Sequence, residues 1–197
     1  MLEGILWTPP AHAQTRVARG AIVCHPHPQY GGSMHNKVVF RAGRALHQLG
    51  MVVLRFNFRG VGRSTGSYDY GHGERADVQA AIDYLNQQYP QIEIVLAGFS
   101  FGAWVGLAVG AQHGRVSHLI GIGMPVNMND FSFLVNCTKP KLFIQGSEDE
   151  FGSIECMQAL LLTIPEPKEL VWVEGADHFF HRKLEPLADA ITDYFTR

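Results

Sequence analysis

The feature that most constrains the fold is a strand-like run that passes straight into a helix-like one at residues 92–112. The apolar run IEIVLAGFS leads into FGAWVGLAVGAQ, which is rich in glycine and alanine, and no polar linker separates them. The junction reads GFSFG, a G-x-S-x-G pattern. Small residues on both sides of a sharp turn let the strand and helix backbones pass close together. We therefore predict a buried strand, a strained turn at Ser100, and a helix over residues 101–112.

The rest of the chain alternates in the same way, which is typical of a parallel sheet with helices on both faces. Residues 1–14 read as a first strand. Further strands are expected at 20–26, 51–58, 92–100, 117–126, 140–146 and 169–175, and helices at 36–49, 74–89, 101–112, 153–162 and 184–195. No repeat or linker interrupts the pattern, so one domain over residues 1–197 is expected. The segment 126–138 is too short to hold an inserted lid domain.

Composition narrows the class of protein. The chain has 197 residues, of which 46% are hydrophobic and 17% charged, enough for a substantial core. Its net charge of -2 argues against nucleic-acid binding. No apolar run reaches the length of a membrane span, and the N-terminal segment lacks the basic region of a secretory signal. The three widely spaced cysteines, without a C-x-x-C pair, favour reduced thiols and a cytoplasmic location.

Ser100 is the candidate nucleophile. A serine at such a turn projects its hydroxyl from the carboxyl edge of the sheet, beside the amides that begin the next helix. The alternative is a small-residue turn in which Ser100 only caps the helix. A serine hydroxyl needs a base, and the base needs a carboxylate to orient it. In this architecture the three residues follow in the order serine, acid, histidine.

The candidate base is His178, in the stretch GADHFFH that follows the last predicted strand. A loop at this position allows a histidine to reach back to the nucleophile. His181, three residues on, is expected to begin the final helix or to lie at the surface.

The acid should follow the preceding strand, where QGSEDEFG supplies three carboxylates. Asp149 is favoured over Glu148 and Glu150 because it fits a G-x-x-D turn that begins at Gly146. Asp177 is a weaker alternative, since neighbouring residues of an extended loop rarely face each other and Asp177 is adjacent to His178.

The stretch CHPHPQYGG, residues 24–32, contains one cysteine and two histidines, which are residue types that bind metals. However, a metal needs three or four converging ligands, and histidines two apart in an extended chain point to opposite sides. The prolines enforce that extension, so no metal is expected here. The ring of His25 can instead hydrogen-bond neighbouring loops and hold their shape.

The same stretch follows a predicted strand, where an acyl-transfer site takes the second amide of its oxyanion hole. The first amide should be that of Phe101, the residue after the nucleophile. Because proline has no N–H, the donors available in this loop are His25, His27, Gln29 and Tyr30.

Several of these stretches together resemble the α/β-hydrolase superfamily, and within it the small lidless bacterial hydrolases related to dienelactone hydrolases and carboxylesterases. The resemblance runs from residue 25 to 181, through HPHPQYGGSMHNKVV, LRFNFRGVGRSTG, GFSFGAW, FIQGSEDE and GADHFFH. It implies an α/β-hydrolase fold without a lid domain. The superfamily's usual H-G-x-P loop maps x onto His27, although Pro26 stands where glycine is usual. A cis peptide bond before Pro28 would fit this loop.

The resemblance also bears on the reaction. The dienelactone-hydrolase type uses a cysteine nucleophile, whereas Ser100 indicates ordinary ester chemistry. We therefore expect a serine hydrolase of small-molecule esters that needs no cofactor. A thioesterase, a peptidase-like acyl hydrolase and a non-catalytic interaction module remain as alternatives. A homodimer is a reasonable expectation because two-fold dimers are common.

One further motif, NFRGVGRS, resembles a phosphate-binding loop but lacks the Lys-Ser/Thr of a P-loop and a directly following helix. We read it as a structural turn, with Arg59 available to pair with loop carboxylates.

Overall fold

The apolar run of residues 93–99 forms the central strand of a seven-stranded sheet. The computed structural model describes residues 1–9 and 19–197, so the end of the predicted first strand, residues 10–14, lies outside the described residues. The strand order is β1-β3-β2-β4-β5-β6-β7, and all neighbours are parallel except β1, which runs antiparallel to β3. The strands are β1 Gly4–Trp7, β2 Arg19–Cys24, β3 Val52–Phe56, β4 Glu93–Phe99, β5 Val116–Ile122, β6 Lys141–Gly146 and β7 Lys168–Val173.

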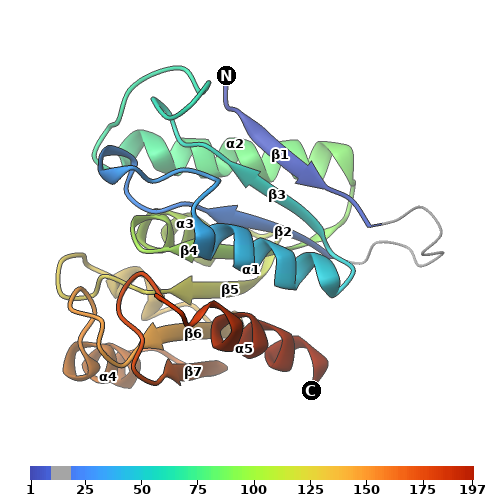
Figure 1. Cartoon of the computed structure of the whole chain (residues 1–197). Coiled ribbons are helices and arrows are strands. Elements are labelled where there is room, and N and C mark those ends of the chain that lie inside the picture. The colour runs from blue at the N-terminus through green and yellow to red at the C-terminus, as the bar shows by residue number, and fades with distance from the viewer. Residues whose placement is uncertain (10–18) are drawn as a thin grey trace.

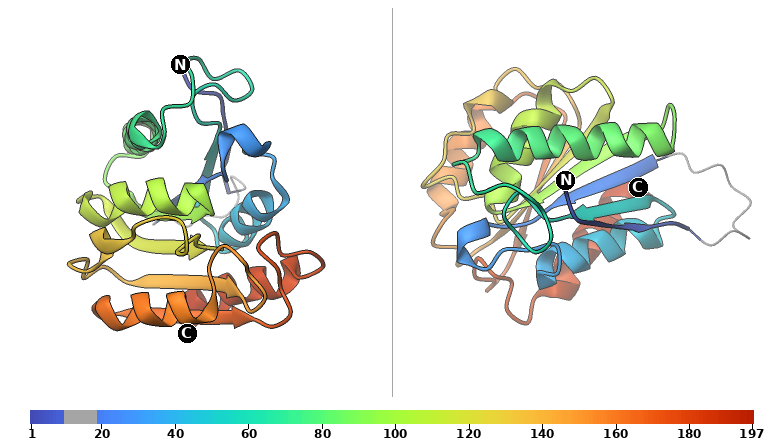
Figure 2. Two further views of the ribbon diagram at one scale, coloured as in Figure 1. Left: turned by 90° about the vertical axis from the view of Figure 1, so that its left-hand side faces the viewer. Right: turned by 90° about the horizontal axis from the view of Figure 1, so that it is seen from above.

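Helices cover both faces of this sheet, as the alternating pattern predicts (Figure 1). The helices are α1 Lys37–Gln48, α2 His72–Gln88, α3 Phe101–Gln112, α4 Ile154–Thr163 and α5 Leu184–Thr196, with the 3-10 turns η1 Pro28–Tyr30 and η2 Ser132–Leu134. Figure 2 shows α1 and α5 on one side of the sheet, and α2 and α3 on the other. This architecture agrees with the one that the resemblance to α/β-hydrolases implies, and the connection between β5 and β6 contains only the short turn η2.

Two hydrophobic cores follow from the two-residue periodicity of the strands. Along β4, Ile94 and Leu96 point into the core beneath α2, α3 and α4, while Val95 and Ala97 point into the core beneath α1 and α5. Full burial of a valine, leucine or isoleucine side chain such as those of Ile94, Val95 and Leu96 stabilises the fold by about 1.5–3 kcal/mol. A strand buried on both faces reads in the sequence as a continuous apolar run, which is the pattern of residues 94–99.

Polar residues set where the helices begin. The side chain of Asn36 accepts a hydrogen bond from Val38 N at the start of α1, and Ser153 accepts one from Cys156 N at the start of α4. Helix α2 begins two residues before the predicted position. The buried carboxylate of Glu74 accepts hydrogen bonds from Asp69 N and Gly71 N, and so extends the helix start into the preceding loop.

The prediction that Arg59 pairs with loop carboxylates is wrong. Its guanidinium binds the carboxylate of Asp77, within α2, with Nη2 and Oδ1 2.9 Å apart. The backbone N–H of Arg59 donates to the same carboxylate over 2.9 Å. Asp77 is nearly buried, so the turn after β3 is attached to the helix packed beside it.

The carboxyl ends of the parallel strands meet at one edge of the sheet, on the left in Figure 1. The loops after β2, β4, β6 and β7, which carry the predicted site residues, all lie along this edge. Over residues 1–9 and 19–197, no helix combines the length and apolar character that crossing a membrane requires.

Candidate active site

The backbone at Ser100 is strained. Its φ of 54° and ψ of -122° lie outside the regions that residues with a side chain prefer. The turn is held from both sides, because Ser100 N donates to Ile122 O of β5 over 2.9 Å and Ser100 O accepts from Ala103 N of α3 over 2.9 Å. The serine therefore stands at a fixed position between β4 and α3. This is the sharp strand-to-helix turn that the sequence predicts.

The two glycines of the motif are required by close backbone packing. A Cβ atom on Gly98 would lie 2.3 Å from the carbonyl oxygen of Gly102, and one on Gly102 would lie 2.5 Å from the carbonyl oxygens of Cys24 and His25. No side chain fits at either distance. The glycines allow α3 to approach β4 and the end of β2, which brings Ser100 next to the loop after β2.

His178 reaches Ser100 from the loop after β7. Its Nε2 atom lies 2.9 Å from Ser100 Oγ. The ring is nearly buried and packs on Phe151 and Phe99, with ring centroids 4.6 Å and 5.3 Å away. These aromatic contacts restrict the ring to an orientation that faces the serine.

Asp149 lies on the other side of His178. Its Oδ2 and Oδ1 atoms are 2.9 Å and 3.0 Å from His178 Nδ1. A carboxylate can only accept, so Nδ1 carries the proton and Nε2 presents its lone pair to the Ser100 hydroxyl. Ser100, His178 and Asp149 thus form one continuous hydrogen-bonded chain.

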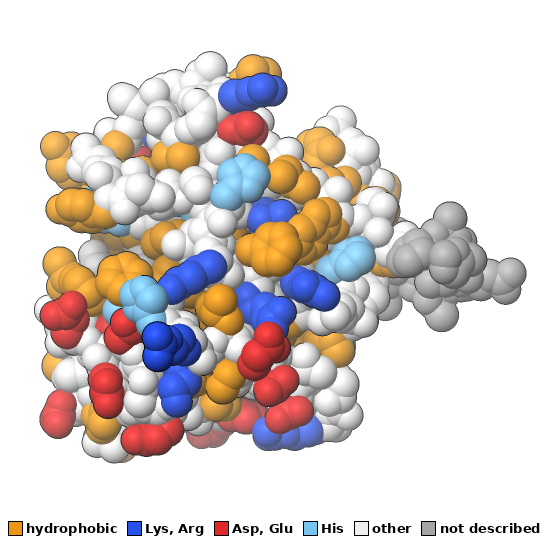
Figure 3. Space-filling model, in the orientation of Figure 1, with side chains coloured by type: hydrophobic (Ala, Val, Ile, Leu, Met, Phe, Trp, Pro, Cys, Tyr) orange, Lys and Arg blue, Asp and Glu red, His pale blue; other side chains and the backbone are white. Residues whose placement is uncertain are grey.

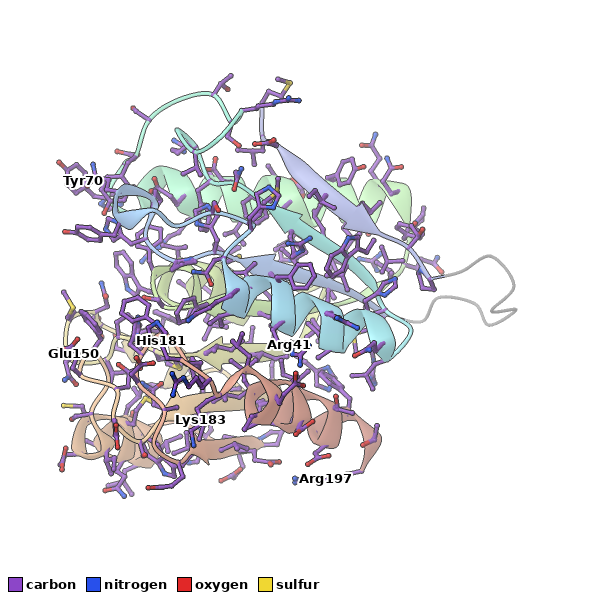
Figure 4. All side chains as sticks on the ribbon, in the orientation of Figure 1. Arg41, Tyr70, Glu150, His181, Lys183 and Arg197 are labelled. Atoms are coloured by element: carbon purple, nitrogen blue, oxygen red, sulfur yellow. The ribbon has the colours of Figure 1, made fainter. Side chains whose placement is uncertain are left out.

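The other acids considered from the sequence lie elsewhere. Glu148 and Glu150 are exposed, and Figure 4 shows Glu150 at the periphery of the molecule. Asp177 accepts from the ring and the backbone N–H of His181. His181 lies at the surface, which is one of the two predicted positions, and α5 begins after it at Leu184.

A buried residue that the sequence reasoning missed supports the Asp149 carboxylate. Gln145, at the end of β6, donates through Nε2 to Asp149 Oδ2 over 2.8 Å and accepts from Met124 N through Oε1 over 2.8 Å. Phe151 N donates to Asp149 Oδ1 over 2.9 Å. The signal was present in the sequence, because Gln145 is the polar residue in the apolar run LFIQG.

Some backbone amides of the loop after β2 are hydrogen-bonded within the loop, and others are not. Tyr30 N donates to His27 O over 3.1 Å, and Gln29 N donates to His27 Nδ1 over 3.2 Å. Among the hydrogen bonds of the described residues, none has the His27 N–H as its donor. Phe101 begins α3, so its amide has no partner within the helix. The His27 and Phe101 rings pack together with centroids 5.0 Å apart, which places these two residues side by side.

The peptide bond before Pro28 is trans, so the expected cis bond is wrong; the cis bond among the described residues precedes Pro167. Pro28 is the first residue of η1, a position where proline has a suitable φ and needs no N–H. His27 is the N-cap of that turn.

The ring of His25 is fully buried and structural. Its Nδ1 atom donates to Pro26 O over 2.6 Å, and its Nε2 atom accepts from Phe58 N over 3.0 Å. Burial lowers the pKa of His25 to about 4, an effect only partly offset by the hydrogen bond to Pro26. The ring therefore stays neutral and connects the loops after β2 and β3.

The ring of His27 is used differently. Because Nδ1 accepts from Gln29, Nε2 carries the proton and donates to the hydroxyl of Tyr68, 3.1 Å away. Burial lowers the pKa of His27, while the nearby Glu74 acts in the opposite direction. The two histidines thus bind separate partners, and the described residues contain no group of three or more His, Cys, Asp or Glu that could hold a metal ion.

Comparison with known proteins agrees with this geometry. The family described as "Alpha/beta hydrolase domain" matches residues 27–189, which is most of the chain. The chain belongs to this α/β-hydrolase family. The matched region contains the loop after β2 from His27 onward, the Ser100 turn and both Asp149 and His178.

Two solved structures are similar over nearly the whole chain. An alpha-beta serine hydrolase homologue from Coxiella burnetii is 38% identical, with a TM-score of 0.92 over 99% of this chain and 92% of that one. A serine hydrolase without a lid from Xanthomonas campestris is 41% identical, with a TM-score of 0.88 over 98% of this chain and 87% of that one. This α/β-hydrolase therefore has the lidless form of the fold.

A relative of uncharacterised function is also similar. The protein RP471 of Rickettsia prowazekii is 40% identical over 183 residues, which cover 88% of this chain and 77% of the relative.

Proposed function

We propose that this α/β-hydrolase is a serine hydrolase that cleaves small carboxylic esters through an acyl-enzyme intermediate. The observation that carries the proposal is the 2.9 Å contact of Ser100 Oγ with His178 Nε2, in a ring whose Nδ1 faces the buried Asp149. This arrangement supplies the three groups that acyl transfer requires, which are a nucleophile, a base and a carboxylate that orients the base.

The first half of the reaction forms the acyl-enzyme. His178 Nε2 takes the proton of the Ser100 hydroxyl while Oγ bonds to the carbonyl carbon. The carbonyl oxygen becomes an oxyanion, which the amides of Phe101 and His27 stabilise. When the bond from carbon to the alcohol oxygen breaks, His178 donates its proton to that oxygen, and the alcohol leaves.

The second half repeats these steps with water. His178 takes a proton from water, whose oxygen attacks the acyl carbon, and then returns a proton to Ser100 Oγ as the acid departs. Asp149 stays ionised and stabilises the imidazolium in both halves.

The decisive experiment compares Ser100→Ala with wild type. We expect a loss of kcat for a short p-nitrophenyl ester of about a thousandfold or more, and loss of labelling by a fluorophosphonate probe. Ser132→Ala, at an exposed serine on η2, serves as the matched control and should retain both. Equal hydrolysis by Ser100→Ala and wild type would contradict the proposal, and an unlabelled wild type would favour a non-catalytic interaction module.

The same three residues could serve an esterase or a thioesterase. Hydrolysis rates for a panel of matched oxygen esters and thioesters distinguish the two activities. We also propose a cytoplasmic location, which the three cysteines support because all of them are free thiols.

A further inference from the structure

A continuous group of aromatic rings extends outward from the oxyanion side of the site. We call Tyr30, Tyr68 and Tyr70 the aromatic wall. It begins at His27, whose ring centroid lies 4.6 Å from that of Tyr30 and 4.9 Å from that of Tyr68. Tyr68 also packs on Phe101 at 5.9 Å and on Tyr70 at 5.0 Å. The wall therefore starts at His27 and Phe101, the two residues whose amides we propose to bind the oxyanion.

The outer rings of the wall are exposed. Tyr30 is 85% exposed and Tyr70 is 73% exposed, so neither contributes much buried area to the fold. Figure 4 shows Tyr70 at the edge where the carboxyl ends of the strands lie, and Figure 3 shows hydrophobic side chains gathered along that edge. Large aromatic side chains exposed together beside a site are typical of ligand contacts.

The inner ring is held in place. The Tyr68 hydroxyl accepts a hydrogen bond from His27 Nε2, 3.1 Å away, so its position is coupled to the loop that carries the His27 amide. The wall therefore combines one fixed ring, that of Tyr68, with two exposed rings. The hydrogen bond to His27 fixes the position of the Tyr68 ring relative to the His27 amide.

The chemistry indicates which part of an ester the wall would meet. The leaving alcohol must lie near His178 Nε2, because that atom gives it a proton. The region around His178 is formed by Phe151 and Phe179, with centroids 4.6 Å and 5.2 Å from the His178 ring. The acyl group extends from the same carbon in another direction. The wall packs on His27 and Phe101, whereas the rings beside His178 are Phe151 and Phe179. We therefore assign the wall to the acyl group and the side of His178 to the alcohol.

From this arrangement we propose that the acyl group is aromatic, so that the substrates are esters of arylcarboxylic or arylalkanoic acids. The proposal rests on the serine-hydrolase function given above and narrows its substrate class. An aromatic acyl ring would pack against Tyr68 and be flanked by Tyr30 and Tyr70. Offset or edge-to-face ring contacts add affinity beyond the area buried, and a saturated ring of the same size cannot make them.

The test compares acyl groups while the leaving group stays the same. Ethyl 3-phenylpropanoate and ethyl 3-cyclohexylpropanoate differ only in the ring, and the released acid is measured by chromatography. For wild type, we expect kcat/KM to favour the phenyl ester by about tenfold. Tyr30→Leu and Tyr70→Leu should each reduce that preference, and the double variant should bring it to within about twofold of one. Tyr30→Phe and Tyr70→Phe should retain it.

The control is Tyr84→Leu, at a half-exposed tyrosine on α2 away from the wall, which should keep the wild-type preference. Equal rates for the two esters in wild type, with Ser100 still labelled by a fluorophosphonate, overturn the aromatic acyl class and leave the proposed function intact. Loss of the preference in Tyr84→Leu as well would also overturn it. If wild type hydrolyses no ester and Ser100 is not labelled, the proposed function fails, and the substrate class fails with it.

Discussion

Gln145 donates a hydrogen bond through Nε2 to Oδ2 of Asp149 over 2.8 Å, and both side chains are buried. The same amide nitrogen lies 3.1 Å from Gly152 O, and the amide oxygen accepts from Met124 N. Gln145 thus fixes one oxygen of the Asp149 carboxylate that faces His178. It does so from outside the hydrogen-bonded series of Ser100, His178 and Asp149. Gln145 is a positioning residue in this arrangement, and its removal should affect turnover more than substrate binding.

Gln145→Met keeps the length of the side chain and removes its hydrogen bonds. We expect kcat for a short ester to fall about tenfold, because Asp149 and His178 are held less well, with KM nearly unchanged. Leaving Met124 N unpaired should also lower the free energy of unfolding by about 1–3 kcal/mol. Steady-state kinetics and urea unfolding measure the two effects.

The matched control is Gln48→Met, at an exposed glutamine that ends α1. It should behave like wild type in both measurements. A rise in KM with unchanged kcat in Gln145→Met would show that Gln145 acts on substrate binding and not through Asp149.

The stability of the fold should depend on pH through His25. The folded ring has a pKa of about 4, against an ordinary value of 6.5, because it is buried. The unfolded chain therefore binds more protons between these two values, and the stabilisation is present above pH 6.5 and lost as the pH falls toward 4. The shift corresponds to a loss of about 3 kcal/mol in the free energy of unfolding.

His25→Gln removes this titration but keeps a polar side chain. The variant should be less stable than wild type at pH 7, and the difference should shrink by about 3 kcal/mol at pH 4. Urea unfolding at pH 7, 5.5 and 4 measures it. A difference that stays constant across the three pH values would mean that His25 does not titrate in this range.

Much of the fold followed from local patterns, because a sheet covered on both faces leaves strong signals in the sequence. The apolar run before Ser100 and the glycines around it predicted the strand, the turn and the helix. The expected order of serine, acid and histidine along the chain led to Ser100, Asp149 and His178, and the fold brings these three residues into contact. Their catalytic roles remain predictions, which the Ser100→Ala experiment addresses.

The features that were missed depend on contacts between distant segments. Arg59 meets Asp77 because α2 packs beside the turn after β3, and residue spacing does not specify that packing. The bond between His27 and Tyr68 joins two loops 41 residues apart. The isomer before Pro28 is set by how the loop turns into η1, which the dipeptide alone leaves open. Gln145 differs from these cases, since a single polar residue in an apolar strand already indicates a buried partner.

The role of the His27 amide can be tested by removing that one N–H. The φ of His27 is -52°, which proline accepts, so His27→Pro deletes the amide hydrogen with little change in the backbone. It also deletes the ring, and His27→Ala is the matched control because it loses the ring and keeps the N–H. We expect His27→Pro to have a kcat about a hundredfold below that of His27→Ala, since one oxyanion donor is worth about that much. Circular dichroism and thermal melting check that both variants fold. Equal kcat values for the two variants would place the second donor elsewhere in the loop, and the amides of Gln29 and Tyr30 would need to leave their present partners to serve.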